Sequence, residues 1–233
     1  MVFPNRGEFY STYRHQDFAF RDSIMHYIAK NPKSVKLYQK LVKSCKYFFL
    51  KNPILSLYEL RNTIFGWGAM AEAEDGWTSL DINNVTSKFW ITEGFYGFTD
   101  GSLVPLEKVV EALPKAKTIR YWCTPTSPTS VTGKTFKELI KIPHFMTLDS
   151  FMLWIVPEEF DLESFYIYMK KNVRTEVRLK FGLPLSDGYK IRLNSIVDEI
   201  IATQNHDYSV PWIGFDGMDE EKIDQLESVV FED

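Results

Sequence analysis

The pattern of apolar and polar residues near the start of the chain is helical. Three apolar side chains share one face over 22–29: Ile24, Met25 and Ile28. Their repeat at i, i+1 and i+4 is that of a helix buried along one side. Asp22 is placed to cap the start of this helix. Because a residue before proline is pushed out of the helical region, Asn31-Pro32 is expected to end it.

A second helix is predicted over 35–50. Its apolar stripe repeats at steps of three and four and consists of Leu37, Tyr38, Leu41, Val42, Cys45, Phe48 and Phe49. The rest of the helical wheel is basic and carries Lys36, Lys40, Lys43 and Lys46. Asn52-Pro53 stops this helix by the same steric effect. Two short helices joined by a proline turn predict a compact helical hairpin.

Helical and strand-like patterns alternate in the second half of the chain. Helices are expected over 104–113, 135–142, 162–171 and 191–202. Strands are expected over 118–123, 148–156, 176–181 and 210–215. The last helix is expected to face inward through Ile191, Ile196, Val197, Ile200 and Ile201. The stretch from 62 to 101 is rich in Gly and Trp, and its structure stays open apart from one strand-like run over 88–91.

One junction between a helix and a strand repeats along the chain. The segment 113–119 matches 142–148 in pattern, 29 residues further on, and both contain a proline at the second position. A unit of this length lies at the long end of leucine-rich repeats, about 20–29 residues. Such units stack because none covers its own apolar face. The alternative is an ordinary βα domain with evenly spaced elements. The predicted fold class is α/β: a small N-terminal helical motif followed by a short leucine-rich-repeat-like stack of helix–strand units.

Composition places the chain among folded intracellular proteins. It has 233 residues, 45% of them hydrophobic and 25% charged, which excludes a disordered chain. No stretch has the apolar length of a signal peptide or a spanning helix, so no membrane association is expected. The two cysteines, Cys45 and Cys123, cannot form a disulfide framework and favour a reducing compartment. The expected location is the cytoplasm or the nucleus.

Charge is concentrated at two places. Seven lysines and no acid stand between Lys30 and Lys51, whereas eight acids and one lysine stand between Gly214 and Asp233. The lysines fit a solvated helix face, docking onto an acidic protein surface or, with least support, contact with phosphates. The net charge of −4 argues against a nucleic-acid binder. Whether the acidic tail docks or stays free is left open.

The candidate catalytic motifs are all better explained by structure. Thr132-Gly133-Lys134-Thr135 is similar to the end of a phosphate-binding loop, but Pro128 stands where that loop needs a glycine. The four histidines are scattered singly, so no zinc site is expected. The carboxylates of 158–161 fit turn chemistry and the start of a helix. No enzyme and no cofactor are predicted.

The first 55 residues resemble an F-box. That family opens with a Leu-Pro-x-Asp/Glu-x-x-x-x-Ile element and later carries a Leu-x-x-Val-Cys-Lys-x-Phe-like element. The first is matched here by Phe20, Asp22, Ile24 and Ile28. The second is matched by Leu41, Val42, Cys45, Lys46 and Phe48. Arg21 stands where the family has its proline, and Ser44 is inserted before Cys45.

The chain resembles more closely the F-box-like proteins expanded in nematodes, in which the box precedes leucine-rich-repeat-like units. The phrases that carry this likeness are 104–108 and 196–201. The resemblance implies a non-catalytic substrate receptor of an SCF-type cullin-RING ubiquitin ligase, with a Skp-type adaptor and a cullin complex as partners and an unknown protein target. The alternative is a non-catalytic repeat module that no longer binds the adaptor, favoured by Arg21 and the short middle region. An enzyme would need convergent polar groups that the sequence does not display.

Two sets of residues are predicted to bind partners. The adaptor face is assigned to Phe20, Ile24, Met25, Leu41, Val42 and Phe48. The target face is assigned to Tyr121, Trp122, Trp154 and Trp212, for which core packing is an equal explanation. The expected organisation is an arm over 1–15, a box over 16–55, a linker of uncertain structure over 56–101, an α/β domain over 102–217 and an acidic tail over 218–233.

Overall fold

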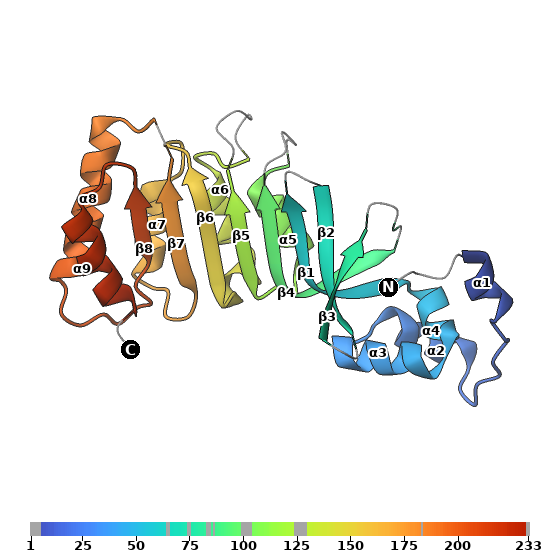
Figure 1. Ribbon diagram of the computed structural model, residues 1–233. Coiled ribbons are helices and arrows are strands. Elements are labelled where there is room, and N and C mark those ends of the chain that lie inside the picture. Colours follow the sequence, from blue (N-terminus) through green and yellow to red (C-terminus); the bar gives the residue numbers. More distant parts are fainter. Residues whose placement is uncertain are drawn as a thin grey trace. The chain divides into compact units, whose positions relative to one another are not determined.

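A computed structural model of the chain has the α/β fold class expected from the sequence (Figure 1). It describes residues 6–63, 66–73, 76–82, 85, 87–98, 104–123, 130–182 and 184–231. The strands are hydrogen-bonded in the order β3-β2-β1-β4-β5-β6-β7-β8. The chain divides into two compact units, Met1–Glu59 with Gly68–Thr92 and Leu60–Trp67 with Glu93–Asp233. Strands β1, β2 and β4 therefore contribute residues to both units.

The first unit begins with short helices. They are α1 (Arg6–Ser11), α2 (Asp22–Lys30), α3 (Val35–Ser44) and α4 (Lys46–Lys51). Helix α2 ends just before Asn31-Pro32, as predicted. The predicted cap is wrong by one residue: Arg21 is the N-cap, and Asp22 is the first helical residue. An acid in the first turn is still favourable there because it faces the positive end of the helix dipole.

The single helix predicted over 35–50 is interrupted at Cys45. This residue is extended (φ −158°, ψ 131°), and its N–H donates to the carbonyl of Leu41 at the end of α3. Its Sγ accepts from the N–H of Tyr47 (3.4 Å) at the start of α4. The apolar spacing continues through the break, which is why the sequence pattern does not reveal it. The break turns α4 so that it packs against both α2 and α3.

Strands occupy most of the stretch whose structure the sequence left open. They are β1 (Ile54–Thr63), β2 (Gly66–Ala73), β3 (Gly76–Asp81) and β4 (Lys88–Phe98). β2 and β3 pair in antiparallel fashion from Gly68↔Asp81 to Ala73↔Gly76. The strand-like run that the sequence did show, 88–91, lies within β4.

The second unit contains parallel strands in the order of the sequence. They are the end of β4, β5 (Thr118–Trp122), β6 (Ser150–Val156), β7 (Glu176–Phe181) and β8 (Trp212–Phe215). Each pairs with the strand that precedes it along the chain. The predicted strands are confirmed, and β7 has the predicted bounds, with its inward positions buried as expected.

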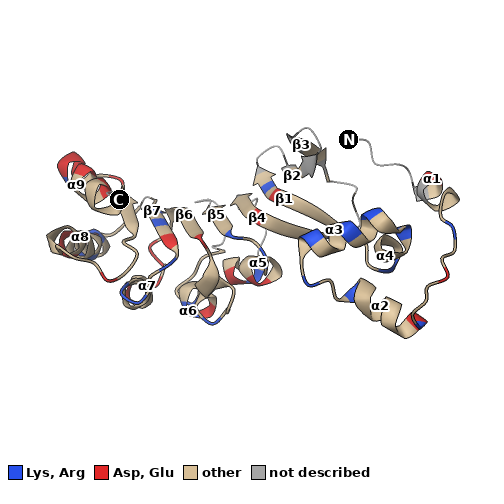
Figure 2. Ribbon diagram, turned by 90° about the horizontal axis from the view of Figure 1, so that it is seen from below, with Lys and Arg blue, Asp and Glu red and all other residues tan. Residues whose placement is uncertain are grey.

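The helices of this unit are α5 (Leu106–Ala112), α6 (Thr135–Leu139), α7 (Leu162–Met169), α8 (Asp187–Ala202) and α9 (Glu220–Phe231), with a 3-10 turn, η1 (Phe145–Thr147). Figure 2 shows α5, α6 and α7 on one side of the strands. The strand side chains that face them are fully buried, among them Ile119, Phe151, Leu153 and Leu179. Phe136 of α6 is the centre of an aromatic cluster with Phe145, Phe160, Phe165 and Tyr168.

The buried face of α8 differs from the prediction, and the acidic tail, whose state the sequence left open, forms a helix. In α8 the buried face is Leu193, Ile196, Val197 and Ile200, which leaves Ile191 70% exposed on the other side. The prediction that Ile191 faces inward is therefore wrong. The acidic tail forms α9, which buries Leu226 and packs against α8 and β8. Lys222, its one lysine, pairs with Asp198 (2.6 Å) of α8.

Candidate functional site

Helix α2 has two apolar faces, and one of them forms a small core. Met25 and Ala29 are buried together with Phe48 of α4, and other apolar residues are partly buried against them. These are Phe18, Ile28, Leu41, Val42, Cys45 and Tyr47. Four of the six predicted adaptor-binding residues thus lie in or against this core: Met25, Phe48, Leu41 and Val42.

The other apolar face of α2 is exposed. Phe20 is 63% exposed, Ile24 46% and Tyr27 68%. Ile24 and Tyr27 are three residues apart and lie on one side of the helix, and Phe20 lies in the segment just before its N-cap, Arg21. The sequence analysis missed Tyr27, although its position seven residues after Phe20 was a usable signal. We call Phe20, Ile24 and Tyr27 the α2 outer face.

Hydrogen bonds to Asn52 and Tyr38 hold the helices in place. The Asn52 side-chain amide donates to the carbonyl of Ala29 (3.1 Å). The Tyr38 hydroxyl donates to the carbonyl of Asn52 (2.7 Å) and accepts from the N–H of Ile54 (3.0 Å). Burial raises the pKa of Tyr38, so its hydroxyl keeps the proton it donates. These bonds link α2, α3 and the end of α4 to the start of β1.

Helix α3 carries a row of exposed lysines. Lys36, Lys40 and Lys43 lie four and then three residues apart, and the blue segments of α3 in Figure 2 mark them. Within the described ranges no ion pair involves these three side chains. The first unit therefore presents basic groups as well as the α2 outer face.

In the second unit, three tryptophans lie on the face of the sheet opposite helices α5–α7. Trp122 and Trp154 are register partners on β5 and β6, and their rings stack with centroids 6.3 Å apart and planes at 15°. The ring of Trp212 on β8 reaches across to Trp154, with centroids also 6.3 Å apart. All three are partly buried. We call Trp122, Trp154 and Trp212 the tryptophan row.

Tyr121, the fourth predicted target residue, lies on the opposite face. It is 4% exposed and alternates with Trp122 along β5. Successive residues of a strand point to opposite faces, so Tyr121 and Trp122 cannot belong to one surface. Tyr121 is part of the core beneath the helices.

The backbone next to the tryptophan row is irregular. β6 has a bulge between Trp154 and Val156, and Ile155 within it has φ 60°. A β-branched residue rarely adopts this left-handed conformation. On β8, a Cβ at Gly214 would lie 2.5 Å from the ring of Trp212. Glycine at 214 therefore lets the Trp212 ring lie along the sheet toward Trp154.

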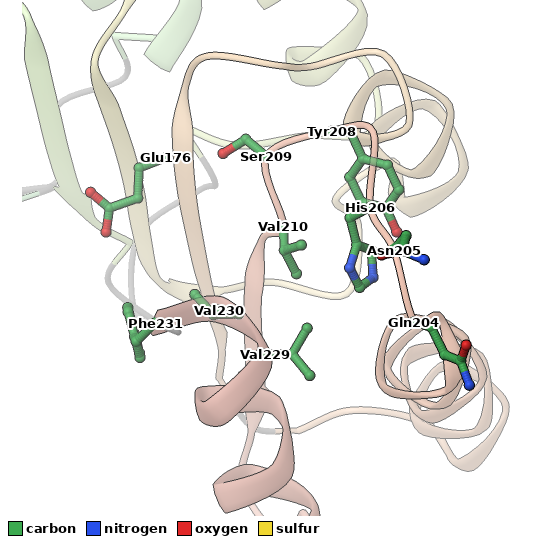
Figure 3. A pocket seen from close by; sticks show the side chains of 10 residues that line it. All are labelled: Glu176, Gln204, Asn205, His206, Tyr208, Ser209, Val210, Val229, Val230 and Phe231. Carbon is green, nitrogen blue, oxygen red and sulfur yellow. The ribbon is translucent and has the colours of Figure 1, made fainter. Parts of the chain in front are cut away.

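A pocket of about 480 Å³ lies beside the end of α9 (Figure 3). It is lined by Glu176, Gln204, Asn205, His206, Tyr208, Ser209, Val210, Val229, Val230 and Phe231. Its polar groups are held by the fold: Glu176 pairs with Arg178 (2.5 Å), and His206 Nε2 is 3.1 Å from the carbonyl of Ile200. Within the described part of the chain, no hydrogen bond joins Ser209 to His206 as a nucleophile–base pair would require.

The other candidate chemical groups have structural roles. Asp161 caps α7 by accepting from the N–H of Ser164 (3.0 Å), and Glu158 accepts from the N–H and hydroxyl of Ser186 (both 2.6 Å). Burial raises the pKa of the Cys123 thiol to about 12, so it holds its proton at neutral pH. Among the residues that the structure describes, no three His, Cys, Asp or Glu side chains are grouped as a metal site.

The comparisons with known proteins give no relative. Neither a family model, nor a curated protein, nor a solved structure matches the chain. No helix in the described ranges has the length and apolar character needed to cross a membrane. The fold class is α/β, and the two candidate surfaces are the α2 outer face in the first unit and the tryptophan row in the second.

Proposed function

We propose that the chain is a non-catalytic substrate receptor of an SCF-type cullin-RING ubiquitin ligase and that its N-terminal helices bind a Skp-type adaptor. The α2 outer face is the observation that carries this proposal. Ile24 and Tyr27 are large and exposed on a helix whose other face already has its core, and Phe20 is a large exposed ring just before the start of that helix. Large apolar and aromatic side chains grouped in this way, with a polar rim, are typical of protein interfaces.

The lysines of α3 supply the polar rim. Lys36, Lys40 and Lys43 would favour an adaptor with an acidic surface, mainly by speeding association and rejecting basic partners. Binding energy would come from the apolar anchors, since a few buried aromatic and aliphatic side chains dominate most interfaces.

Arg21, which stands in place of the family's proline, is compatible with the backbone of the box. Its φ is −58° and its ψ 145° at the N-cap of α2. Proline fixes φ near about −65°, so both residues favour the same entry into the helix. Replacement of the family's proline by Arg21 is therefore compatible with the same backbone conformation at the start of α2.

The second unit would hold the target. Its parallel strands follow one another in sequence order, with a helix in each connection, and this arrangement supports the leucine-rich-repeat-like stack suggested by the repeat spacing. A receptor of this kind makes and breaks no bond. It acts by raising the effective concentration of target lysines near the ubiquitin-charged enzyme.

A repeat module that no longer binds the adaptor is the second candidate. It is favoured by the burial of Met25 and Phe48, each 5% exposed, which leaves the proposed adaptor face with fewer anchors than the sequence suggested. The two functions differ in one measurable property, adaptor binding.

Calorimetric titration of the whole chain with a purified Skp-type adaptor tests the proposal. We expect micromolar or tighter binding, about −8 kcal/mol. Ile24→Glu should weaken it at least tenfold, because it places a charge on the α2 outer face. Ile191→Glu is the matched control: it changes an isoleucine that is 70% exposed on α8 and should bind as the wild type does. If the folded wild type does not bind the adaptor, the receptor proposal is rejected and the second candidate, a repeat module without adaptor binding, is supported.

A further inference from the structure

The face of the sheet that carries the tryptophan row also carries a cation, Arg120, for which the described residues supply no ionic partner. Arg120 lies two residues before Trp122 on β5, on the same face. Its guanidinium carbon is 5.0 Å from the ring centroid of Tyr96, and its Nε is buried without a hydrogen-bond partner in the described structure. On the neighbouring strand, the hydroxyl of Ser150 is also buried and without a partner in the described ranges. Both groups are suited to an acceptor supplied by a ligand.

Two other cations of this face are paired with carboxylates. Arg178 contacts Glu176 (2.5 Å) and Lys180 contacts Asp216 (3.2 Å). Nucleic-acid binding draws on several phosphate contacts at once. A face on which two of the cations are already neutralised suits a ligand with few negative charges, such as an acidic peptide.

The spacing of the tryptophan rings favours an extended peptide. Neighbouring ring centroids are 6.3 Å apart along the row. Alternate side chains of an extended chain are about 6.6 Å apart, whereas residues on one face of a polyproline helix recur at about 9.3 Å. An extended segment can therefore place every second side chain on successive tryptophans.

The irregular backbone beside the row is a separate sign of a binding surface. The bulge in β6 follows Trp154 directly and holds Ile155 at φ 60°. Bulges re-aim neighbouring side chains, and strained residues persist where the surrounding structure holds them.

We infer that the tryptophan row and Arg120 form a binding surface for an extended acidic peptide segment. Apolar side chains at alternate positions of the segment stack on Trp122, Trp154 and Trp212. A carboxylate next to the residue on Trp122 accepts from Arg120. This inference deepens the proposed function, on which it rests for the identity of the ligand as a ubiquitylation target.

Peptide selection tests the inference. A phage library of random dodecamers is selected on the immobilised whole chain, with depletion on the bare support. The leading peptide is then labelled and titrated by fluorescence anisotropy. We expect selected sequences in which apolar residues alternate along the chain and Asp or Glu is enriched. Their affinity should fall as salt is added, because a partly exposed ion pair is screened.

Variants locate the surface. Arg120→Gln and Trp154→Ala should each weaken the leading peptide at least tenfold, and Trp154→Phe should weaken it less. The controls change similar residues elsewhere: Arg174→Gln replaces an exposed arginine, and Ile167→Ala removes an exposed apolar group from α7. Both should bind within twofold of the wild type. Circular dichroism checks that each variant is folded.

Three results would overturn the inference: no enriched peptide, enrichment of basic sequences, or an enriched peptide that binds Arg120→Gln as well as the wild type. Tighter binding of a labelled dT12 oligonucleotide than of any selected peptide would also overturn it, in favour of a nucleic acid. Adaptor titration reports on α2 alone. A failure here with adaptor binding intact therefore rejects the peptide surface and leaves the proposed function standing.

Discussion

The helical part of the first unit and the α/β part of the second use their apolar residues differently. In the second unit, inward residues of successive strands are fully buried beneath the helices, and Phe136 has aromatic neighbours on several sides. In the helical part, Met25, Ala29 and Phe48 form the buried core, and other large apolar residues stay half exposed. Short helices offer too little interior for the apolar residues they carry. The surplus in the first unit is what suggests a partner.

Replacing one phenylalanine in each unit gives the largest expected contrast. Phe136→Ala should lower the free energy of unfolding by about 3–5 kcal/mol, because it leaves a cavity in a closed core. Phe20→Ala removes a ring that is 63% exposed and should change the free energy of unfolding by no more than about 0.5 kcal/mol. Urea denaturation followed by circular dichroism measures both. A loss of several kcal/mol for Phe20→Ala would show that its ring is part of a core.

The two cysteines extend the comparison to chemical reactivity. Cys123 of the second unit is buried, and its thiol keeps its proton because burial raises its pKa to about 12. Cys45 of the first unit is only partly buried. In the folded chain at pH 8, iodoacetamide should alkylate Cys45 at least a hundredfold faster than Cys123, as peptide mass spectrometry can follow.

The same thiol gives a pH dependence of stability. An unfolded thiol loses its proton near about pH 8.5. The stabilisation from the protonated Cys123 is therefore complete below about pH 8.5 and is lost as the pH rises toward its folded pKa of about 12. Cys123→Ala should remove this part of the alkaline loss of stability. An unchanged alkaline profile would contradict the burial of the thiol.

Strain in the bulge predicts a smaller effect. Ile155 has φ 60°, a conformation that asparagine tolerates better than a β-branched residue does. Ile155→Asn should therefore raise the free energy of unfolding by about 1 kcal/mol. The control is Ile167→Asn on α7, where the backbone is regular and asparagine should destabilise slightly. Equal effects of the two variants in urea would exclude strain at Ile155.

The smallest effect is expected at the start of α2. Because Arg21 already has φ −58°, Arg21→Pro should stabilise the chain by about 0.4–1 kcal/mol through the unfolded state. Thermal unfolding compares it with Asp22→Pro, which lies at the next position. A destabilised Arg21→Pro would mean that the arginine side chain has a structural role and would weaken the comparison with the F-box element.

The elements with clear periodicity could be predicted, and the others could not. β7 alternates along its length and was predicted with its bounds, and α2 was predicted to within a residue at each end. The break at Cys45 leaves the helical spacing intact, so no pattern records it. β2 and β4 contain glycines, and β1, which has none, lacks a regular alternation of apolar and polar residues, so these strands were left unassigned apart from the run over 88–91.

The sequence alone could predict the candidate surfaces only in part, because burial depends on residues that are distant along the chain. Strand alternation alone separates Tyr121 from Trp122, and this rule could have been applied to the sequence. Which of the two faces is covered depends on the helices that pack on the sheet, so burial of Tyr121 required the structure. The meeting of Trp154 and Trp212 across β7 is likewise a property of the register and of Gly214.

Hydrogen exchange of the whole chain, with and without the Skp-type adaptor, tests the central claim most directly. If the surplus apolar surface of the first unit is the docking site, the adaptor should slow exchange of amides in α2 and in the lysine-bearing α3. Exchange in β5–β8 should not change. Protection confined to β5–β8, or no protection at an adaptor concentration that saturates a known receptor, would contradict the account.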